Sequence, residues 1–271
     1  MALRQPAVAG KFYPRTERQV RGEIDRLYDT YLGRRPRLNT AGPRKIVGLV
    51  VPHAGYVYSG PVAAYAYAAL ANDGFPETFI VIGPNHSGLG SPVSMTTEDF
   101  DTPLGEVRVD KEIIKGMGRL IVDDPMAHRY EHSIEVQLPF IQYFKEDITF
   151  VPIAMAAQDH ETAVEVAEEI KKACRGRDVV IIASTDFSHY VPAQEAAKQD
   201  RSVIDRILAL DAEGVYDTVI RKNISMCGYG PVMAMLLASG GSRAELLKYG
   251  NSGDVSPMED VVGYAAIKVV R

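Results

Sequence analysis

The stretch Asp178-Val-Val-Ile-Ile-Ala-Ser-Thr-Asp-Phe-Ser-His-Tyr190 joins a short apolar run to an abruptly polar end. Residues 179–182 are four consecutive β-branched residues, which predicts a strand buried on both faces, as in a sheet covered by helices. The polar end contains Ser184, Asp186 and His189. Open α/β sheets bind their ligands just beyond the carboxyl ends of the strands, so a functional site is expected here.

Two other segments repeat this pattern of a buried strand that leads to a histidine. Residues 46–51, Ile-Val-Gly-Leu-Val-Val, run into Pro52 and His53, and residues 79–82, Phe-Ile-Val-Ile, run into Gly-Pro-Asn and then His86. A single histidine in such a place is most often a structural residue. Three histidines at equivalent places, with His189 as the third, favour a common site at one edge of the sheet.

The rest of the chain alternates between strand and helix patterns. Further strands are predicted at 148–153, 244–249 and 261–270, a hairpin at 91–109, and helices at 16–32, 61–71, 111–117, 133–144, 159–174, 193–210, 212–220 and 231–238. Thr16 and Gln19 fit a capping box at the first helix, and residues 55–60 are predicted to form a turn. The alternation predicts an α/β fold, a three-layer α/β/α sandwich around a mixed, mostly parallel sheet, in a single domain of residues 1–271.

The composition is that of a globular protein and argues against several classes of function. Of the 271 residues, 46% are hydrophobic and 24% are charged, and the formal net charge is −5. No basic stripe stands out, so nucleic-acid binding is not expected. No apolar run approaches the ~20 residues of a membrane span, and the N-terminus lacks the apolar core of a signal peptide. Two cysteines make no disulfide framework, and a cytoplasmic location is expected.

Two further segments contain residues suited to chemistry. His128 and His132 are four residues apart, as in the helix of zinc proteases, but that motif requires a glutamate where this chain has Arg129, and a zinc-protease site is excluded. Cys227 lies in a glycine-rich loop just before Pro231, which is predicted to begin a helix. A thiol near a helix N-terminus tends toward the thiolate, the reactive and metal-binding form. The alternative for Cys227 is a small buried residue at a tight turn.

Motifs spread over nearly the whole chain resemble those of the Memo family. In chain order they are Gly10-Lys-Phe-Tyr-Pro14, Val51-Pro-His-Ala-Gly-Tyr56, Tyr58-Ser-Gly60, Gly83-Pro-Asn-His86, Thr102-Pro-Leu-Gly105, Glu131-His-Ser-Ile-Glu135, Leu138-Pro-Phe140, Ser184-Thr-Asp-Phe-Ser-His189, Cys227-Gly228 and Val262-Gly-Tyr264. The fold of this family is similar to that of class III extradiol ring-cleaving dioxygenases, which hold non-haem Fe(II) with two histidines and a carboxylate. The resemblance therefore implies a dioxygenase-like fold.

The resemblance also implies a set of metal ligands. His53 and His86 fall on the two histidine positions, and Cys227 takes the third position in place of the carboxylate. A soft thiolate ligand favours copper or zinc over the Fe(II) of ring cleavage. The implied cofactor is a transition metal ion, iron or copper, with zinc as a further option. The family has been linked to metal-dependent redox activity and to the binding of protein partners, without a settled reaction.

Two catalytic hypotheses follow for the residues around this metal position. In the leading one, the protein is a metal-binding protein and an oxidoreductase, and His189 serves as general acid/base, oriented by Asp186 and assisted by His132, which the resemblance places in the same pocket. In the second, no metal is bound: Cys227 is a nucleophile, His189 activates it and Asp186 orients the histidine.

A third hypothesis is a binding module without catalysis. The cleft of an ancestral enzyme would then recognise a peptide or a small molecule, with Tyr56 and Tyr58 at its rim. The partners expected under all three hypotheses are a small molecule or a peptide in the cleft, with no nucleic acid and no membrane. The sequence indicates no oligomeric state.

Overall fold

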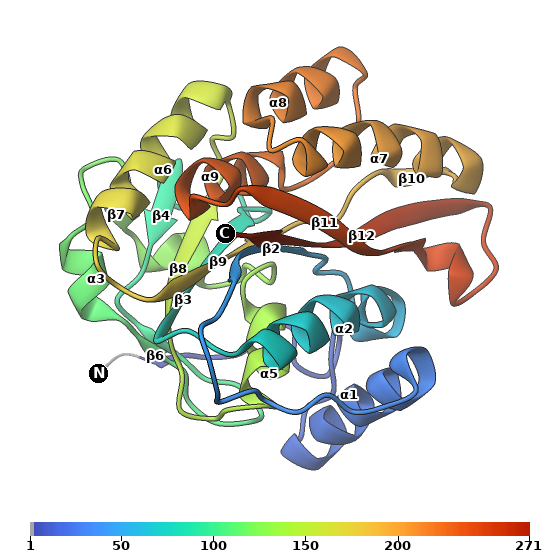
Figure 1. Ribbon diagram of the computed structural model, residues 1–271, viewed down its shortest axis with the longest axis horizontal. Helices are drawn as coiled ribbons and strands as arrows, with labels where there is room; N and C mark the ends of the chain where they lie inside the picture. The colour runs from blue at the N-terminus through green and yellow to red at the C-terminus, as the bar shows by residue number, and fades with distance from the viewer. Residues whose placement is uncertain (1–2) are drawn as a thin grey trace.

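The computed structural model describes residues 3–271, and four parallel strands lie at the centre of its sheet (Figure 1). In spatial order they are β2 (Ile46–Val51), β9 (Val179–Ser184), β3 (Thr78–Pro84) and β8 (Thr149–Met155). Nearly every residue in these strands is buried, as their β-branched sequences predict. The parallel register aligns Val51 with Ser184 and Pro84 with Met155, so the four strands end at one edge of the sheet.

Other strands extend this centre on both sides. β12 (Asp260–Val270) runs antiparallel to β2, and both β10 (His189–Pro192) and β11 (Arg243–Asn251) pair with β12. On the far side, β4 (Val93–Met95) is antiparallel to β8 and parallel to β7 (Val122–Asp123), while β6 (Arg108–Val109) pairs in parallel with the start of β8. A separate ladder joins β1 (Leu3–Arg4) to β5 (Asp99–Phe100). The sheet is therefore mixed, with a parallel centre.

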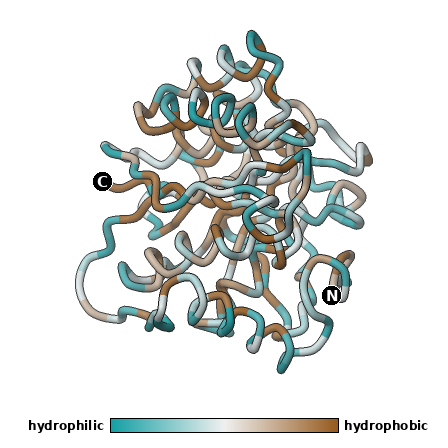
Figure 2. The backbone as a smooth tube through the Cα atoms, turned by 90° about the vertical axis from the view of Figure 1, so that its right-hand side faces the viewer, coloured by the Kyte–Doolittle hydropathy of each residue, from teal (hydrophilic) through white to brown (hydrophobic). Residues whose placement is uncertain are grey.

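Helices cover both faces of the sheet (Figure 1). On one face lie α1 (Glu17–Leu32), α2 (Tyr56–Asp73) and α5 (Leu138–Gln142), and on the other α6 (His160–Ala173), α7 (Ala193–Leu208), α8 (Ala212–Arg221) and α9 (Tyr229–Ser239). Shorter turns are α3 (Lys111–Lys115), α4 (Pro125–His128), η1 (Glu135–Gln137) and η2 (Ser252–Asp254). Hydrophobic segments concentrate along the strands between the two layers (Figure 2). The predicted three-layer α/β sandwich is confirmed.

Side chains at the helix starts explain several element boundaries. Asp159 and Asp211 each accept a hydrogen bond from a backbone N–H in the first turn of α6 and α8, which satisfies donors that have no partner inside the helix. The capping box predicted at α1 is absent, because the Thr16 hydroxyl donates to the side chain of Gln19 (2.8 Å) instead of accepting from the helix. Burial of its apolar face holds α1 in place. Within residues 3–271, no helix is both long and apolar enough to cross a membrane.

Three segments differ from the sequence-based predictions. Residues 56–60 form the first turns of α2 rather than a separate turn, because Tyr56 is buried (3% exposed) and its hydroxyl donates to the carbonyl of Val136. The helix predicted at 133–144 is divided into η1 and α5, because Pro139 has no N–H with which to continue it. The hairpin predicted at 91–109 forms only around its turn, where Phe100 and Val107 exchange two backbone hydrogen bonds in an antiparallel bridge. The earlier part of this segment, β4, pairs with β8 instead.

Candidate functional site

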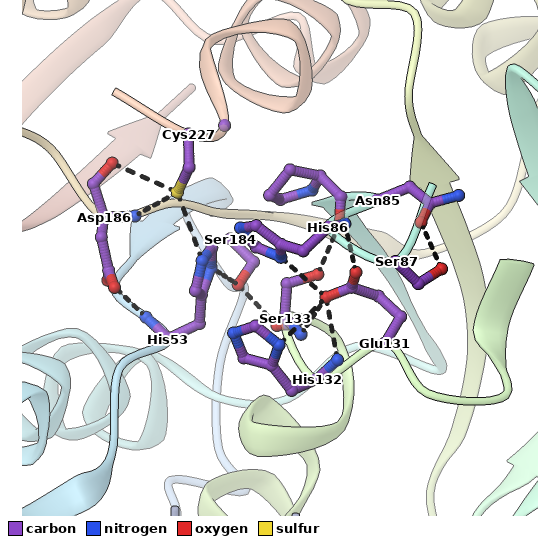
Figure 3. Close-up of polar contacts among 12 residues, drawn as sticks. His53, Asn85, His86, Ser87, Glu131, His132, Ser133, Ser184, Asp186 and Cys227 are labelled. Atoms are coloured by element: carbon purple, nitrogen blue, oxygen red, sulfur yellow. Dashed lines mark hydrogen bonds and ion pairs between the residues drawn. The ribbon is translucent and has the colours of Figure 1, made fainter. Parts of the chain in front are cut away.

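His53 lies directly beyond β2, buried at the carboxyl edge of the sheet (Figure 3). Its ring nitrogen Nδ1 is 2.9 Å from the hydroxyl oxygen of Ser184, the last residue of β9. That hydroxyl donates its own proton to the carbonyl of Ser133 (2.6 Å), so it accepts a hydrogen bond from Nδ1–H of His53. The other ring nitrogen, Nε2, therefore carries the lone pair, and it faces the sulfur of Cys227 at 3.3 Å.

His86, in the loop after β3, is fixed in the same way by a carboxylate. Its Nδ1 lies 3.0 Å from Oε1 of Glu131, whose two oxygens also accept from the backbone N–H groups of His86, His132 and Ser133 (Figure 3). Burial would raise the pKa of Glu131, but the hydrogen bond and charge of His86 and these N–H groups outweigh it and hold the pKa well below its usual range. The ionised carboxylate accepts the proton of Nδ1, so in the neutral ring, the form that binds a metal, Nε2 of His86 carries the lone pair.

Cys227 approaches the two histidines from the loop before α9. Gly228 makes this approach possible, because a Cβ atom there would lie 2.6 Å from the carbonyl oxygen of Ser184. The sulfur accepts a hydrogen bond from the N–H of Asp186 (3.2 Å). Burial and the nearby charge of Asp186 raise the pKa of the thiol, so without a cation it keeps its proton, which differs from the predicted thiolate. A bound metal ion would supply the positive charge that this thiol needs to ionise.

Two groups of side chains at the site are close enough to hold a metal ion. The ligand atoms of His53, His86 and Cys227 all lie within 4.8 Å of one another, and so do those of His86, Glu131 and His132. In the second group, the carboxylate of Glu131 is already engaged by four N–H donors. In the first group the competition is weaker, because the sulfur of Cys227 accepts one backbone N–H, that of Asp186, and faces Nε2 of His53 at 3.3 Å. Two imidazoles and a thiolate are a donor set that transition metals accept, so these residues fit the implied metal.

A cleft of about 510 Å³ lies beside these side chains, and its lining includes His132, Asp186 and His189. The structure therefore brings the six candidate residues of the sequence analysis to one place at the carboxyl edge of the sheet. His132 lies with its ring stacked on that of His86, at 4.7 Å between centroids and 21° between planes. Burial lowers the pKa of His132, which keeps this ring neutral near pH 7.

The hydrogen bonds orient some of these residues differently from the prediction. Nδ1 of His189 lies 2.8 Å from the carbonyl oxygen of Ser225, so Ser225, rather than Asp186, orients this ring. Asp186 instead accepts the backbone N–H of His53 (2.8 Å), and burial raises its pKa to about 6. Of the two tyrosines expected at the rim, Tyr58 lines the cleft. Tyr56 is buried instead, and its backbone N–H donates to the carbonyl of Phe12.

Sequence reasoning did not identify residues 131–137 as the support of the site. The hydroxyl of Ser133 donates to the carbonyl of Pro84 at the end of β3, and the side-chain amide of Gln137 donates to the carbonyl of Pro52 beyond β2 (3.0 Å). A Cβ atom at Gly83 would lie 2.3 Å from the hydroxyl oxygen of Ser133, so this approach requires glycine. The available signal was the alternation of polar residues at 133, 135 and 137 with apolar residues at the start of the segment predicted to be an apolar helix.

The same segment anchors the N-terminal residues over the cleft. The carboxylate of Glu135 is fully buried and accepts hydrogen bonds from the guanidinium of Arg4, the N–H groups of Ala7 and Val8 (2.8 and 3.1 Å), and the hydroxyl of Tyr13 (2.6 Å). Residues 4–13 are thereby folded against the site. Within them, the ring of Phe12 packs edge-on against the ring of His132, with 4.7 Å between centroids.

Comparison with known proteins identifies relatives over the full length of the chain. The family model described as Memo-like protein matches residues 4–268. A MEMO1 family protein of Methanosarcina mazei is 50% identical, covering 99% of this chain and 100% of that protein, and one of Ignicoccus hospitalis is 43% identical, covering 99% of each. The crystal structure of the uncharacterized protein JW3007 from Escherichia coli K12 superposes with a TM-score of 0.51 at 13% identity, covering 83% of this chain and 99% of that one, and so shares the fold. With a family match over almost every residue and relatives near 50% identity, this chain belongs to the Memo family.

Proposed function

We propose that this Memo-family protein binds one transition metal ion through His53, His86 and Cys227 and acts as a metal-dependent oxidoreductase on a small molecule or peptide in the cleft. The observation that carries the proposal is the hydrogen bonding of the two histidines. Each Nδ1–H is held by a protein acceptor, one by the hydroxyl of Ser184 and one by the carboxylate of Glu131. This arrangement favours one tautomer of each ring, with Nδ1 protonated and Nε2 free to bind a metal, as in many metal sites. Nε2 of His53 faces the sulfur of Cys227 at 3.3 Å, and the ligand atoms of the three residues lie within 4.8 Å of one another.

The donor set limits the identity of the metal and the chemistry available. Two imidazoles and one thiolate suit copper, iron or zinc better than Mg²⁺ or Ca²⁺, which prefer oxygen ligands. A bound ion of this kind would supply Lewis acidity and, for copper or iron, one-electron redox chemistry. His189 is positioned to move a proton: its Nδ1–H is held by the carbonyl of Ser225, so its Nε2 is the atom that can exchange a proton with a ligand in the cleft.

The metal-free nucleophile is the weaker alternative. The sulfur of Cys227 lies beside Nε2 of His53, and the ring of His189 is held by Ser225, so the expected Cys-His-Asp chain is not formed by these contacts. Burial also raises the pKa of the thiol, which opposes the thiolate that a nucleophile needs. A binding module without turnover is the second candidate, favoured by the aromatic side chains that line the cleft, Phe12, Tyr58 and Tyr190.

Metal analysis of three proteins tests the proposal. The wild type, Cys227→Ser and Cys174→Ser are purified without added metal, loaded with Cu(II), Fe(II) or Zn(II), and dialysed before elemental analysis. Cys174 lies at the C-terminal end of α6 and does not line the cleft. Its variant is therefore a control that makes the same substitution outside the proposed metal site. We expect about one equivalent in the wild type and in Cys174→Ser, and loss of metal in Cys227→Ser. Equal occupancy in all three proteins would contradict the ligand set.

A further inference from the structure

Tyr190 combines two unusual properties at the mouth of the cleft. Its side chain lines the cleft yet is 77% exposed, the largest exposed fraction among the exposed large hydrophobic residues of the described chain. Its backbone φ is +55°, in the left-handed region that residues with a Cβ atom rarely adopt. Neither property helps to bury apolar surface.

The left-handed backbone of Tyr190 does not end a helix, which is the usual place for such a residue. Among residues 3–271, three residues other than glycine have positive φ, and the other two are Leu210 and Asn223. Each of these directly follows the C-cap of a helix, α7 or α8, where a left-handed residue commonly ends the helix. Tyr190 instead lies inside strand β10. A strained residue of this kind persists where the surrounding structure enforces it, and such residues cluster at functional sites.

A bulge in β10 explains how the strain arises and what it achieves. His189 pairs with Val262 and Val191 pairs with Val261, so Tyr190 is an extra residue between two consecutive partners on β12. In a regular strand, His189 and Tyr190 would point to opposite faces of the sheet. Here both side chains line the same cleft, which the bulge makes possible.

We propose that Tyr190 is a ligand-contacting residue, presented by the bulge so that its ring packs against a flat apolar group of the molecule that occupies the cleft. The inference rests on the proposed function, since it concerns the ligand that approaches the metal. The other aromatic rings at the cleft, those of Phe12 and Tyr58, provide further apolar surface for such a group. The ligand is therefore expected to carry a planar apolar moiety next to the group that reaches the metal.

Two probes that bind metals through the same ring nitrogen test this inference. Cobalt(II)-loaded protein is titrated with imidazole and with 4-phenylimidazole, and the absorption of the metal reports the dissociation constant of each. The variants are Tyr190→Asn, which suits a left-handed backbone, Tyr190→Phe, which keeps the ring, and Tyr130→Asn, which removes another exposed tyrosine outside the lining of the cleft.

The wild type should prefer 4-phenylimidazole, and Tyr190→Asn should lose about threefold to tenfold of this preference, the usual worth of an aromatic contact. The affinity for imidazole should stay unchanged, and the other two variants should keep the preference. The melting temperature of metal-free Tyr190→Asn should equal or exceed that of the wild type, because asparagine relieves the backbone. An unchanged preference in Tyr190→Asn, or a lower melting temperature, overturns the inference alone. Absence of any cobalt signal in the wild type would refute the proposed function and this inference with it.

Discussion

Replacement of Glu131 by glutamine should weaken metal binding although Glu131 is not proposed as a ligand. Its Oε1 accepts three N–H donors, from Nδ1 of His86 and from the backbones of His132 and Ser133, whereas Oε2 accepts only the backbone N–H of His86. In Glu131→Gln, the amide oxygen can keep the three donors of Oε1. The amide nitrogen then faces the N–H of His86, so one hydrogen bond is lost and the negative charge that favours Nδ1–H disappears.

Loss of such a partner behind a histidine ligand usually lowers metal affinity 10- to 100-fold, or about 1.4 to 2.8 kcal/mol. Competition against a coloured chelator measures this change, and thermal melting checks that the fold is intact. Glu165→Gln, at an exposed position on α6, is the matched control and should bind metal like the wild type. A folded Glu131→Gln variant with wild-type affinity would refute the claim that this carboxylate orients His86.

Three further predictions concern the ligands, the pH and the N-terminal anchor. His53→Ala should lose metal sharply, whereas His189→Ala should keep its metal and lower the rate of any reaction about 10²- to 10⁴-fold. Equilibrium dialysis measures the metal content of both variants. Equal metal loss in the two would place His189 among the ligands. Because burial raises the pKa of the Cys227 thiol, metal binding must release its proton, so affinity should rise about tenfold per pH unit between about pH 7.5 and 9; a pH-independent affinity would exclude the sulfur as ligand. Arg4→Met breaks a buried ion pair and should cost about 3 to 5 kcal/mol of unfolding free energy in urea titrations. Arg21→Met removes exposed pairs and should cost no more than about 1 kcal/mol, and similar losses in the two variants would contradict the anchoring role.

The sequence was most informative where local pattern and burial agree. The β-branched runs before His53, His86 and Asp186 predicted three adjacent strands correctly, because a strand buried on both faces needs an almost continuous apolar sequence. Local pattern failed at residues 56–60, where the burial of Tyr56 favours a helix. It failed in part at 91–109, where the predicted hairpin forms between Phe100 and Val107 but β4 pairs with β8.

The site, like the fold, could be predicted where it depends on local sequence and not where it depends on contacts between distant residues. The place of the three candidate ligands came from the strand ends and from the resemblance to the Memo family. The contacts that orient them did not, because they join residues far apart in the chain: Glu131 to His86 over 45 positions, and Ser225 to His189 over 36. A carboxylate next to a histidine in sequence gives no sign of which ring it will hold. The metal-binding and catalytic roles stay predictions until the variants described above are measured.

Residues 131–137 also limit how the sequence of this protein can change over evolution. Every second side chain of this short segment contacts a different part of the protein. Glu131 binds His86, and Ser133 binds the end of β3. Glu135 binds the N-terminal residues, and Gln137 binds the carbonyl of Pro52 beyond β2. Insertion of one residue would move every later side chain out of step with its partner. A library of single insertions should therefore lose folded protein here, while the exposed loop of residues 33–45 accepts them. The sequence of this segment would then diverge slowly, because a change in any one contact would need a matching change in its partner.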